Sequence, residues 1–224
     1  MREIVIDTET TGLDHKLGDR IVEVGCVELK NHIPTGKTLQ FYCKTDKQIS
    51  EEAQKISGIT NDFLSNYGTF KDNYKSFLDF IKEDTLILHN AKFDIGFLNN
   101  ELSILGQPPI NNYIIDTVDL ARKTLNTRIA NLDYLCRRFN IDLSQRDLHG
   151  ALLDSQLLAS VYLELRGGKQ FSMELEQETS KPKKNTKTIY GNKINQIFAT
   201  EEDLEAHKKM LKNIKKPIWD NYNY

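Results

Sequence analysis

Apolar side chains recur with two different spacings along the chain, and the change of spacing predicts the order of strands and helices. Residues 3–12, 20–29 and 38–43 are rich in β-branched residues and partly alternate between apolar and polar positions, which is typical of strands. Gly36 predicts a turn before the third segment. We expect these three strands to pair as antiparallel neighbours.

After residue 50 the apolar positions follow helical spacing, interrupted by two short apolar runs. The expected helices cover residues 50–56, 70–81, 93–105, 118–125 and 131–139, and a last helix has its apolar face over residues 157–165. The short runs at 85–89 and 113–115 predict buried strands. Strands that first follow one another and then alternate with helices indicate an α/β fold, with a mixed five-stranded sheet flanked by helices.

Length and composition narrow the class of protein. With 224 residues and 39% hydrophobic composition, the chain is long enough for one sizeable α/β domain with an appendage. The formal net charge is −2, so metal ions or local lysines and arginines would have to supply the positive charge for a nucleic-acid ligand. From residue 167 onward there are 11 Lys and Arg against 8 Asp and Glu, so a basic tail follows an acidic body.

The three cysteines, Cys26, Cys43 and Cys136, form neither a C-x-x-C pair nor a spacing typical of metal ligands. We expect them to be buried apolar side chains. The sequence does not open with a signal-peptide pattern, and no apolar stretch approaches the length of a membrane span. These features predict a soluble, cytoplasmic protein.

The first predicted strand ends in two carboxylates, Asp7 and Glu9. Side chains two positions apart share one face of a strand, so these two would lie close enough to share a divalent cation. Two like charges at such a distance are unfavourable without a cation. An ordinary solvated strand end before a turn at residues 11–12 is the alternative, and this stretch alone does not separate the two.

Three further candidates, Asp94, His149 and Asp154, stand where other elements end, which is where ligands of α/β sheets bind. Five positions turn a helix through about 500°, so His149 and Asp154 can face one site only if His149 lies in the loop before the helix. Gly150 permits that bend. Simpler roles are open for each: a helix cap for Asp94, a surface loop for His149 and a solvent-facing position for Asp154.

Other polar residues at element ends are interpreted as structural. Ser50, Asp116 and Asn131 each precede a predicted helix and are expected to cap it. His89 is expected to pack or bond locally at a strand end.

Three segments resemble the motifs of the DEDDh 3′→5′ exonucleases: Asp-Thr-Glu at 7–9, His-Asn-Ala-Lys-Phe-Asp at 89–94 and His-Gly-Ala-Leu-Leu-Asp at 149–154. They stand in the family's order within residues 1–165. The resemblance implies a ribonuclease-H-like fold, two divalent cations, Mg²⁺ or Mn²⁺, and hydrolytic removal of nucleotides from a 3′ end.

The resemblance also implies a role for each matched residue. Asp7, Glu9 and Asp154 resemble direct metal ligands, and Asp94 resembles a ligand near the second cation, partly through water. His149 resembles the general base that takes a proton from the attacking water. Carboxylate oxygens are the ligands that such hard cations prefer.

Further matches resemble contacts to the terminal nucleotide. They are Thr8, Thr10, Thr11 and Gly12, beside the ligands Asp7, Glu9 and Asp154. Glu52 matches a position that meets the 3′ hydroxyl of the sugar. Ser57 departs from the family, in which His often stands before the glycine, so we expect base or sugar contacts, rather than hydrolysis, to differ there.

The chain divides into an expected exonuclease domain (residues 1–168), a polar linker (169–189) and a tail (190–224). Gln-Phe-Ser-Met-Glu-Leu at 170–175 is similar to the motif by which bacterial proteins dock on the replication sliding clamp, with a chance apolar patch as the alternative. The tail, with a helix predicted to begin near Thr200, resembles the polymerase-binding tail of bacterial DNA polymerase III proofreading subunits. Packing back on the body is the alternative.

The favoured function is proofreading: removal of mispaired nucleotides from single-stranded or frayed DNA 3′ ends, beside the catalytic subunit of DNA polymerase III. An RNA 3′-end trimming exoribonuclease is an alternative, because the catalytic motifs do not distinguish the two sugars. A non-catalytic nucleic-acid or polymerase adaptor is a third reading, against which the clustered carboxylates argue, since they would cost a scaffold stability without serving it.

Overall fold

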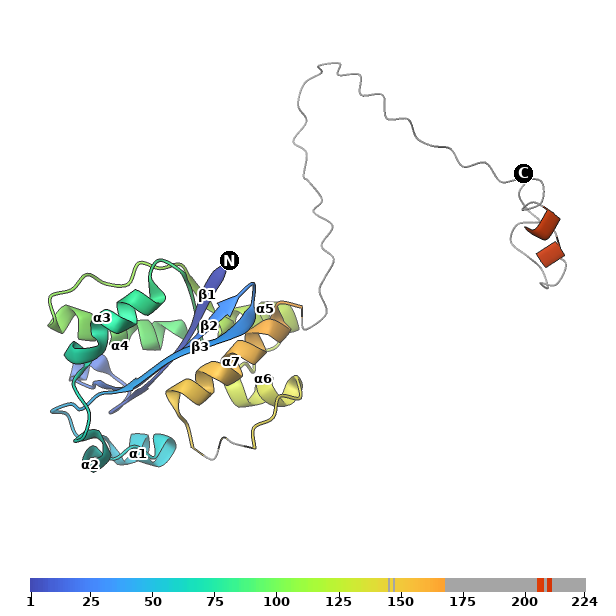
Figure 1. Cartoon of the computed structure of the whole chain (residues 1–224). Coiled ribbons are helices and arrows are strands. Elements are labelled where there is room, and N and C mark those ends of the chain that lie inside the picture. Colours follow the sequence, from blue (N-terminus) through green and yellow to red (C-terminus); the bar gives the residue numbers. More distant parts are fainter. Residues whose placement is uncertain (145, 147, 168–204, 208, 211–224) are drawn as a thin grey trace, which may run out of the picture. The chain divides into compact units, whose positions relative to one another are not determined.

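The computed structural model describes residues 1–144, 146, 148–167, 205–207 and 209–210. Two compact units follow from the contacts, Met1–Glu174 and Leu175–Tyr224. The first holds the α/β domain of Figure 1. In the second, residues 205–207 and 209–210 are helical and fall within the helix predicted for the tail, whose predicted start near Thr200 lies outside the described residues. The expected linker, its clamp-like motif and the remaining tail lie outside the described residues.

In the described part of the chain, five strands form one mixed sheet. They are β1 (Arg2–Thr10), β2 (Ile21–Lys30), β3 (Ile33–Tyr42), β4 (Thr85–Leu88) and β5 (Ile114–Asp116). Their order in the sheet is β3-β2-β1-β4-β5. Strand β2 pairs antiparallel with both β1 and β3, and β4 pairs parallel with both β1 and β5. This confirms the predicted fold class, including the antiparallel start.

The turn between β2 and β3 was predicted wrongly. The chain reverses at Asn31 and His32, whose φ angles are 52° and 68°, so β3 begins at Ile33 rather than at residue 38. Gly36 lies inside β3 with a φ of 85°, in the region where the pairing with β2 changes register. The left-handed glycine therefore accommodates an irregularity of the strand rather than a turn.

Helices cover both faces of the sheet (Figure 1). On one face lie α3 (Phe70–Ile81) and α4 (Ala91–Ile104), and on the other α5 (Thr117–Leu125), α6 (Leu132–Arg138) and α7 (Ala151–Leu165). Strand β1 contributes to both cores because its side chains alternate. Ile4 and Ile6 pack in the cluster of Phe77 and Phe97, whereas Val5 packs in the cluster of helix α7.

Local capping follows the prediction at the helices flanking this core. Helix α1 (Glu51–Ser57) begins after Ser50, whose hydroxyl accepts the N–H of Ala53 at 3.2 Å. Asn131 likewise accepts the N–H of Tyr134 at 2.8 Å at the start of α6. Two short elements, the 3₁₀ turn η1 (His15–Leu17) and helix α2 (Asn61–Leu64), were not predicted.

Helix α7 is bonded to the sheet near both of its ends. At its start, the carboxylate of Glu23 on β2 accepts the N–H of Ala151 at 3.1 Å. Near its end, the buried Tyr162 donates its hydroxyl to Oε1 of Glu3 on β1 at 2.8 Å. The other oxygen of Glu3 accepts the backbone N–H of His32 at 3.1 Å. Two buried carboxylates thus fix the position of α7 along the sheet.

Among the described residues, no helix has the length and apolar character that crossing a membrane would require. Cys26, Cys43 and Cys136 are free and buried, as predicted.

Candidate active site

Strands β1 and β2 place the first two candidate carboxylates on the sheet face that α7 covers. Asp7 pairs across the strands with Gly25, and Glu9 pairs with Glu23. Directly opposed residues of an antiparallel pair share a face, and Val5, two positions before Asp7, packs in the α7 cluster. Asp7 and Glu9 therefore lie on the α7 side, both partly exposed.

The start of α7 approaches β2 so closely that a side chain at position 25 would not fit. A Cβ on Gly25 would lie 2.2 Å from the carbonyl carbon of Ala151. Ser155 strengthens the contact by donating its hydroxyl to the carbonyl oxygen of Gly25 at 2.9 Å. Glu23 replaces the missing side-chain cap of the helix. This contact brings the first turn of α7, with Asp154, against the strand next to β1.

The third carboxylate comes from the opposite helix layer. Asp94, only 3% exposed in the first turn of α4, accepts the N–H of Thr8 at 3.1 Å and its hydroxyl at 2.7 Å. The N-cap of α4 is Asn90, with a φ of 65°, so Asp94 is not the cap. Asp116 accepts the N–H groups of Asn90 and Ala91 at 3.2 and 2.8 Å and also caps α5, as predicted. Asp94 is thereby bonded to β1 between Asp7 and Glu9.

The fourth carboxylate and the imidazole lie at the start of α7. The helix begins at Ala151, so His149 lies in the preceding loop, the one arrangement that lets it face the same site as Asp154. Asp154 is 4% exposed, and its Oδ2 lies 3.2 Å from Nδ1 of His149. Candidate ligand atoms of Glu9, His149 and Asp154 all lie within 4.8 Å of one another. The fold therefore gathers residues that are more than 140 positions apart in sequence.

One further residue, Arg146, binds this group and was not selected from the sequence. Its Nε and Nη2 donate to the two carboxylate oxygens of Asp154 at 2.6 and 2.7 Å, and Nη2 lies 3.0 Å from Nδ1 of His149. Nη1 donates to Asp133 of α6. The side chain is only 7% exposed. Arg146 is therefore a buried side chain that connects Asp154, His149 and Asp133.

Three of the four acids have raised pKa values. Burial, followed by the charges of Asp94 and Glu9, raises the pKa of Asp7 well above its ordinary value. Burial raises the pKa of Glu9 to about 7, although the nearby His149 acts in the opposite direction. Burial also raises the pKa of Asp94 to about 7, against the hydrogen bonds from Thr8. The charges of neighbouring carboxylates add to the effect of burial at Asp7 and Glu9.

Asp154 is the exception. Burial alone would raise its pKa, but the hydrogen bonds from Arg146 and His149 outweigh burial and hold the pKa below its ordinary value. The same bond to Asp154 raises the pKa of His149, while burial and the charge of Arg146 oppose the rise. The acid that has a guanidinium beside it is thus the acid whose pKa is lowered.

The donor set fits divalent cations. Four carboxylates offer hard oxygen ligands, and the guanidinium on one of them shows that this position accepts positive charge. A bound cation would lower the raised pKa values of the other three. Asp7, Glu9, Asp94 and Asp154 are the residues that could hold it, with His149 at the edge of the cluster, 45% exposed.

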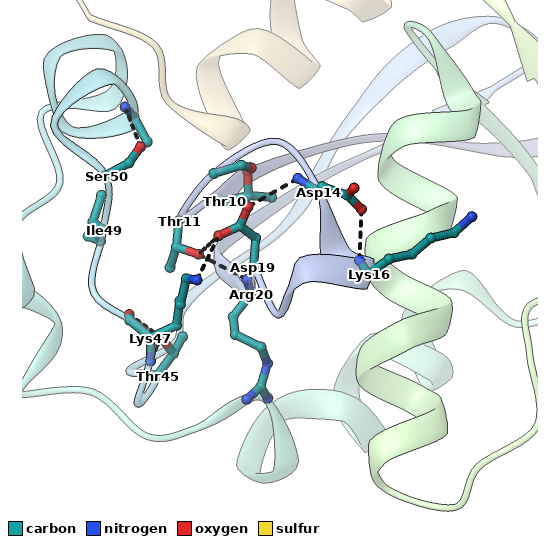
Figure 2. A network of polar contacts seen from close by, with 12 residues as sticks. Thr10, Thr11, Asp14, Lys16, Asp19, Arg20, Thr45, Lys47, Ile49 and Ser50 are labelled. Atoms are coloured by element: carbon teal, nitrogen blue, oxygen red, sulfur yellow. Dashed lines mark hydrogen bonds and ion pairs between the residues drawn. The ribbon is translucent and has the colours of Figure 1, made fainter.

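The threonine loop that follows β1 is held by Asp19, which was also not identified from the sequence. Figure 2 shows its carboxylate between Thr11, whose hydroxyl it accepts at 3.2 Å, and Asp14, whose N–H it accepts at 3.1 Å. A Cβ on Gly12 would lie 2.4 Å from Oδ2 of Asp19, so any larger residue here would displace this carboxylate. The hydroxyl of Thr10 donates to the carbonyl oxygen of Gly12 at 2.5 Å. The loop predicted to meet the nucleotide is therefore tightly bonded.

The two remaining predicted contacts lie on α1. Glu52 is exposed in the first turn of this helix. The hydroxyl of Ser57 donates to the carbonyl oxygen of Ala53 at 3.0 Å and accepts the N–H of Ile59 at 3.2 Å, so it closes the helix end. No described contact joins either side chain to the carboxylates, and their roles toward a nucleotide stay predictions.

Two observations complete the site. Nδ1 of His89 lies 2.8 Å from the hydroxyl oxygen of Thr117, which is the local bond expected at this strand end.

The residues that sequence reasoning missed are Glu23, Asp19 and Arg146. None belongs to a motif, and only Glu23 left a signal, since an acid one strand away from Glu9 becomes conspicuous once the β1–β2 register is known.

Comparison with known proteins agrees with this geometry. The sequence profile of a family described as "Exonuclease" matches residues 4–162. The protein named DNA polymerase III subunit epsilon of Rickettsia felis is 42% identical over 224 residues, which cover 96% of this chain and 98% of the relative. The protein of the same name from Escherichia coli K12 is 39% identical, with 96% and 94% covered.

Solved structures share the fold. The nuclease domain of 3′hExo, described as a DEDDh family member bound to rAMP, matches with a TM-score of 0.64 at 22% identity, covering 74% of this chain and 92% of that one. Exonuclease X in complex with 5′ overhanging duplex DNA matches with a TM-score of 0.59 at 22% identity, covering 73% and 90%. These likenesses confirm the ribonuclease-H-like architecture that the motifs implied.

Proposed function

The chain belongs to the exonuclease family and, within it, to the epsilon subunits of bacterial DNA polymerase III, and from this premise we propose that it removes mispaired nucleotides from DNA 3′ ends. The reaction is a 3′→5′ hydrolysis that needs divalent cations, two ions of Mg²⁺ or Mn²⁺. The observation that carries the proposal is that candidate ligand atoms of Glu9, His149 and Asp154 lie within 4.8 Å of one another, while Asp7 shares the sheet face of Glu9 and Asp94 is bonded to Thr8 between them.

In this proposal Asp7, Glu9 and Asp154 hold the cations directly, and Asp94 holds the second one partly through water. When bound, the pair would lower the pKa of the attacking water and stabilise charge on the leaving 3′ oxygen. His149 takes the proton of that water. Its exposed position in the loop before α7 suits a base that must reach a seated nucleotide.

The terminal nucleotide is proposed to lie against the loop of Thr10, Thr11 and Gly12, beside the candidate ligands. Gly12 has no side chain, and the bonds to Asp19 fix the loop, so backbone groups can approach the sugar and phosphate closely. A frayed mismatch presents unpaired nucleotides at a lower cost of unpairing than a matched end does. Preference for mispaired ends then needs no reading of base sequence.

Association with the polymerase extends the proposal to the rest of the chain. We assign binding of the polymerase catalytic subunit to residues 190–224 and a sliding-clamp contact to residues 170–175. Deletion of residues 190–224 is expected to leave trimming of short strands unchanged and to abolish co-elution with the polymerase subunit. Co-elution of the shortened chain would move the binding surface to the nuclease domain.

A substrate comparison tests the central proposal. Purified protein with Mg²⁺ is given 3′-labelled DNA and RNA of the same sequence, each paired and mispaired at the end, with and without the polymerase subunit. We expect mispaired DNA to be trimmed fastest and the polymerase to increase the rate. A preference for RNA that ignores mispairing and polymerase would replace proofreading by RNA trimming, and no cleavage under any condition would favour the adaptor.

A further inference from the structure

We infer that Arg146 is the internal counterion of the cation site: without divalent cations its guanidinium holds the carboxylate of Asp154, and it releases that carboxylate when a cation binds. The inference rests on the cation site of the proposed function. The starting observation is that one buried side chain reaches both oxygens of Asp154, Nδ1 of His149 and the carboxylate of Asp133.

The competition follows from where the guanidinium lies. Nε and Nη2 approach Oδ1 and Oδ2 of Asp154 at 2.6 and 2.7 Å, so both ligand oxygens already have a cationic partner. A guanidinium cannot be neutralised by losing a proton in a protein, because its pKa is far above the working range. The repulsion between Arg146 and a cation on Asp154 can therefore be relieved only by movement of the side chain.

The structure also provides a place to which Arg146 can retreat. Nη1 donates to Asp133 in the first turn of α6, a carboxylate whose side chain is 44% exposed and that lies outside the four-acid cluster. Arg146 can keep this ion pair while Nε and Nη2 turn away from Asp154. Their donors are then free for another acceptor, such as a phosphate oxygen of the bound strand.

Release of Asp154 would also free the imidazole. Nδ1 of His149 lies 3.0 Å from Nη2 of Arg146 and 3.2 Å from Oδ2 of Asp154. One ring nitrogen can accept from the guanidinium or donate to the carboxylate, but it cannot do both. Both bonds therefore compete for Nδ1, and with Arg146 withdrawn only the donation to Asp154 remains, which leaves Nε2 as the acceptor that a base requires. Arg146 is thus a positioning residue that couples cation binding to the setting of His149.

The test measures cation affinity without any nucleic acid. Mn²⁺ is titrated calorimetrically into the full chain, into Arg146→Ala and Arg146→Lys, and into Arg137→Ala as the control. Arg137 is exposed on α6, so its replacement removes the same charge without touching Asp154. We expect Arg146→Ala to bind Mn²⁺ roughly tenfold more tightly than the unaltered chain, Arg146→Lys to lie between them, and Arg137→Ala to change affinity less than about twofold.

The sign of the change decides the outcome. If Arg146 only shapes a preformed site, its removal will weaken Mn²⁺ binding or leave it unchanged, and either result overturns the inference. If the unaltered chain binds no Mn²⁺ at all, the cation site of the proposed function fails and this inference fails with it. The two failures are distinguishable because the first leaves the binding of the unaltered chain intact.

A second readout is made on the unaltered chain, and a variant serves only to assign the signal. The Nε–H resonance of Arg146 in an ¹⁵N spectrum of the unaltered chain, assigned by its loss in Arg146→Lys, is followed during addition of Mg²⁺. We expect it to move as the bond to Asp154 is broken, in step with the ring resonances of His149. A resonance that keeps its position at saturating Mg²⁺ would contradict the exchange.

Discussion

Asp94 and Asp154 are equally buried, at 3% and 4% exposure, yet their pKa values shift in opposite directions. Asp94 is held by neutral donors, the N–H and hydroxyl of Thr8, which do not outweigh burial. Asp154 is held by the charged Arg146, which does. Asp94 is therefore bonded to strand β1 by neutral donors and has no cationic hydrogen-bond donor among the described residues. Asp154, in contrast, is held by a guanidinium that can move away.

The largest loss of activity is expected from removing the imidazole of His149, which lies beside Asp154. His149→Ala should lower the rate of hydrolysis by about 10²–10⁴-fold, because no other side chain of the site is positioned as the base. Cation-dependent binding of a single strand should survive, since the four carboxylates are untouched. Rates of 3′-end release and strand affinity, measured on the same preparation, check both statements. Retained turnover would remove His149 from its proposed role.

The next largest loss of activity is expected from adding a methyl group where the start of α7 contacts β2. Gly25→Ala would put a Cβ 2.2 Å from the backbone of Ala151, so α7 must move away from β2. A displacement of about 1 Å at a reacting site costs roughly 100-fold in rate. Gly150→Ala is the control, because a Cβ there meets nothing within 4 Å and φ is −150°. Similar rates for the two variants would show that this approach does not set the geometry.

The attachment of Asp94 to β1 can be weakened by removing a single hydroxyl group, that of Thr8. Thr8→Val removes the 2.7 Å bond to Asp94 but keeps the backbone bond at 3.1 Å, so we expect a loss of roughly tenfold in kcat with a smaller change in KM. Thr8→Ser should restore the rate. If the valine variant keeps full activity, the backbone N–H alone is sufficient to position Asp94.

The smallest effect is expected from the raised pKa values of Glu9 and Asp94. The folded pKa values of Glu9 and Asp94, about 7 each, lie above those of the unfolded chain, so the folded state binds more protons between about pH 4 and 7. Stability of the cation-free protein should therefore fall as pH rises through that window. Thermal unfolding in EDTA should give a midpoint several degrees lower at about pH 8 than at about pH 5.5. Mg²⁺ should remove most of the difference, and Asp94→Asn should reduce it.

Much of this arrangement could be predicted from periodicity alone. The spacing of two fixes Asp7 and Glu9 on one face, and helical geometry requires His149 to precede α7, where it lies. Caps at Ser50 and Asp116 follow from the ability of short polar side chains to accept helix N–H groups. Each of these statements depends on residues close in sequence, for which local geometry is sufficient.

What could not be predicted depends on contacts between distant segments. Glu23 as the cap of α7 requires the register of β1 and β2 and the approach of a helix that begins 128 positions later. Arg146 is only eight positions from Asp154, but it lies in a loop without periodicity, so sequence spacing does not show that it meets Asp154 rather than solvent. Gly36 misled the turn assignment because a left-handed glycine serves an irregular strand as well as a turn.

The bond between Tyr162 and Glu3 has a mechanical consequence. It fastens α7 to β1 close to the point where the helix ends at Leu165, while Asp154 lies more than two turns upstream. A pull transmitted through the chain beyond residue 167 would load this fastening before it could strain the hydrolytic centre. The geometry of the hydrolytic centre would therefore not depend on what is attached to the chain beyond residue 167.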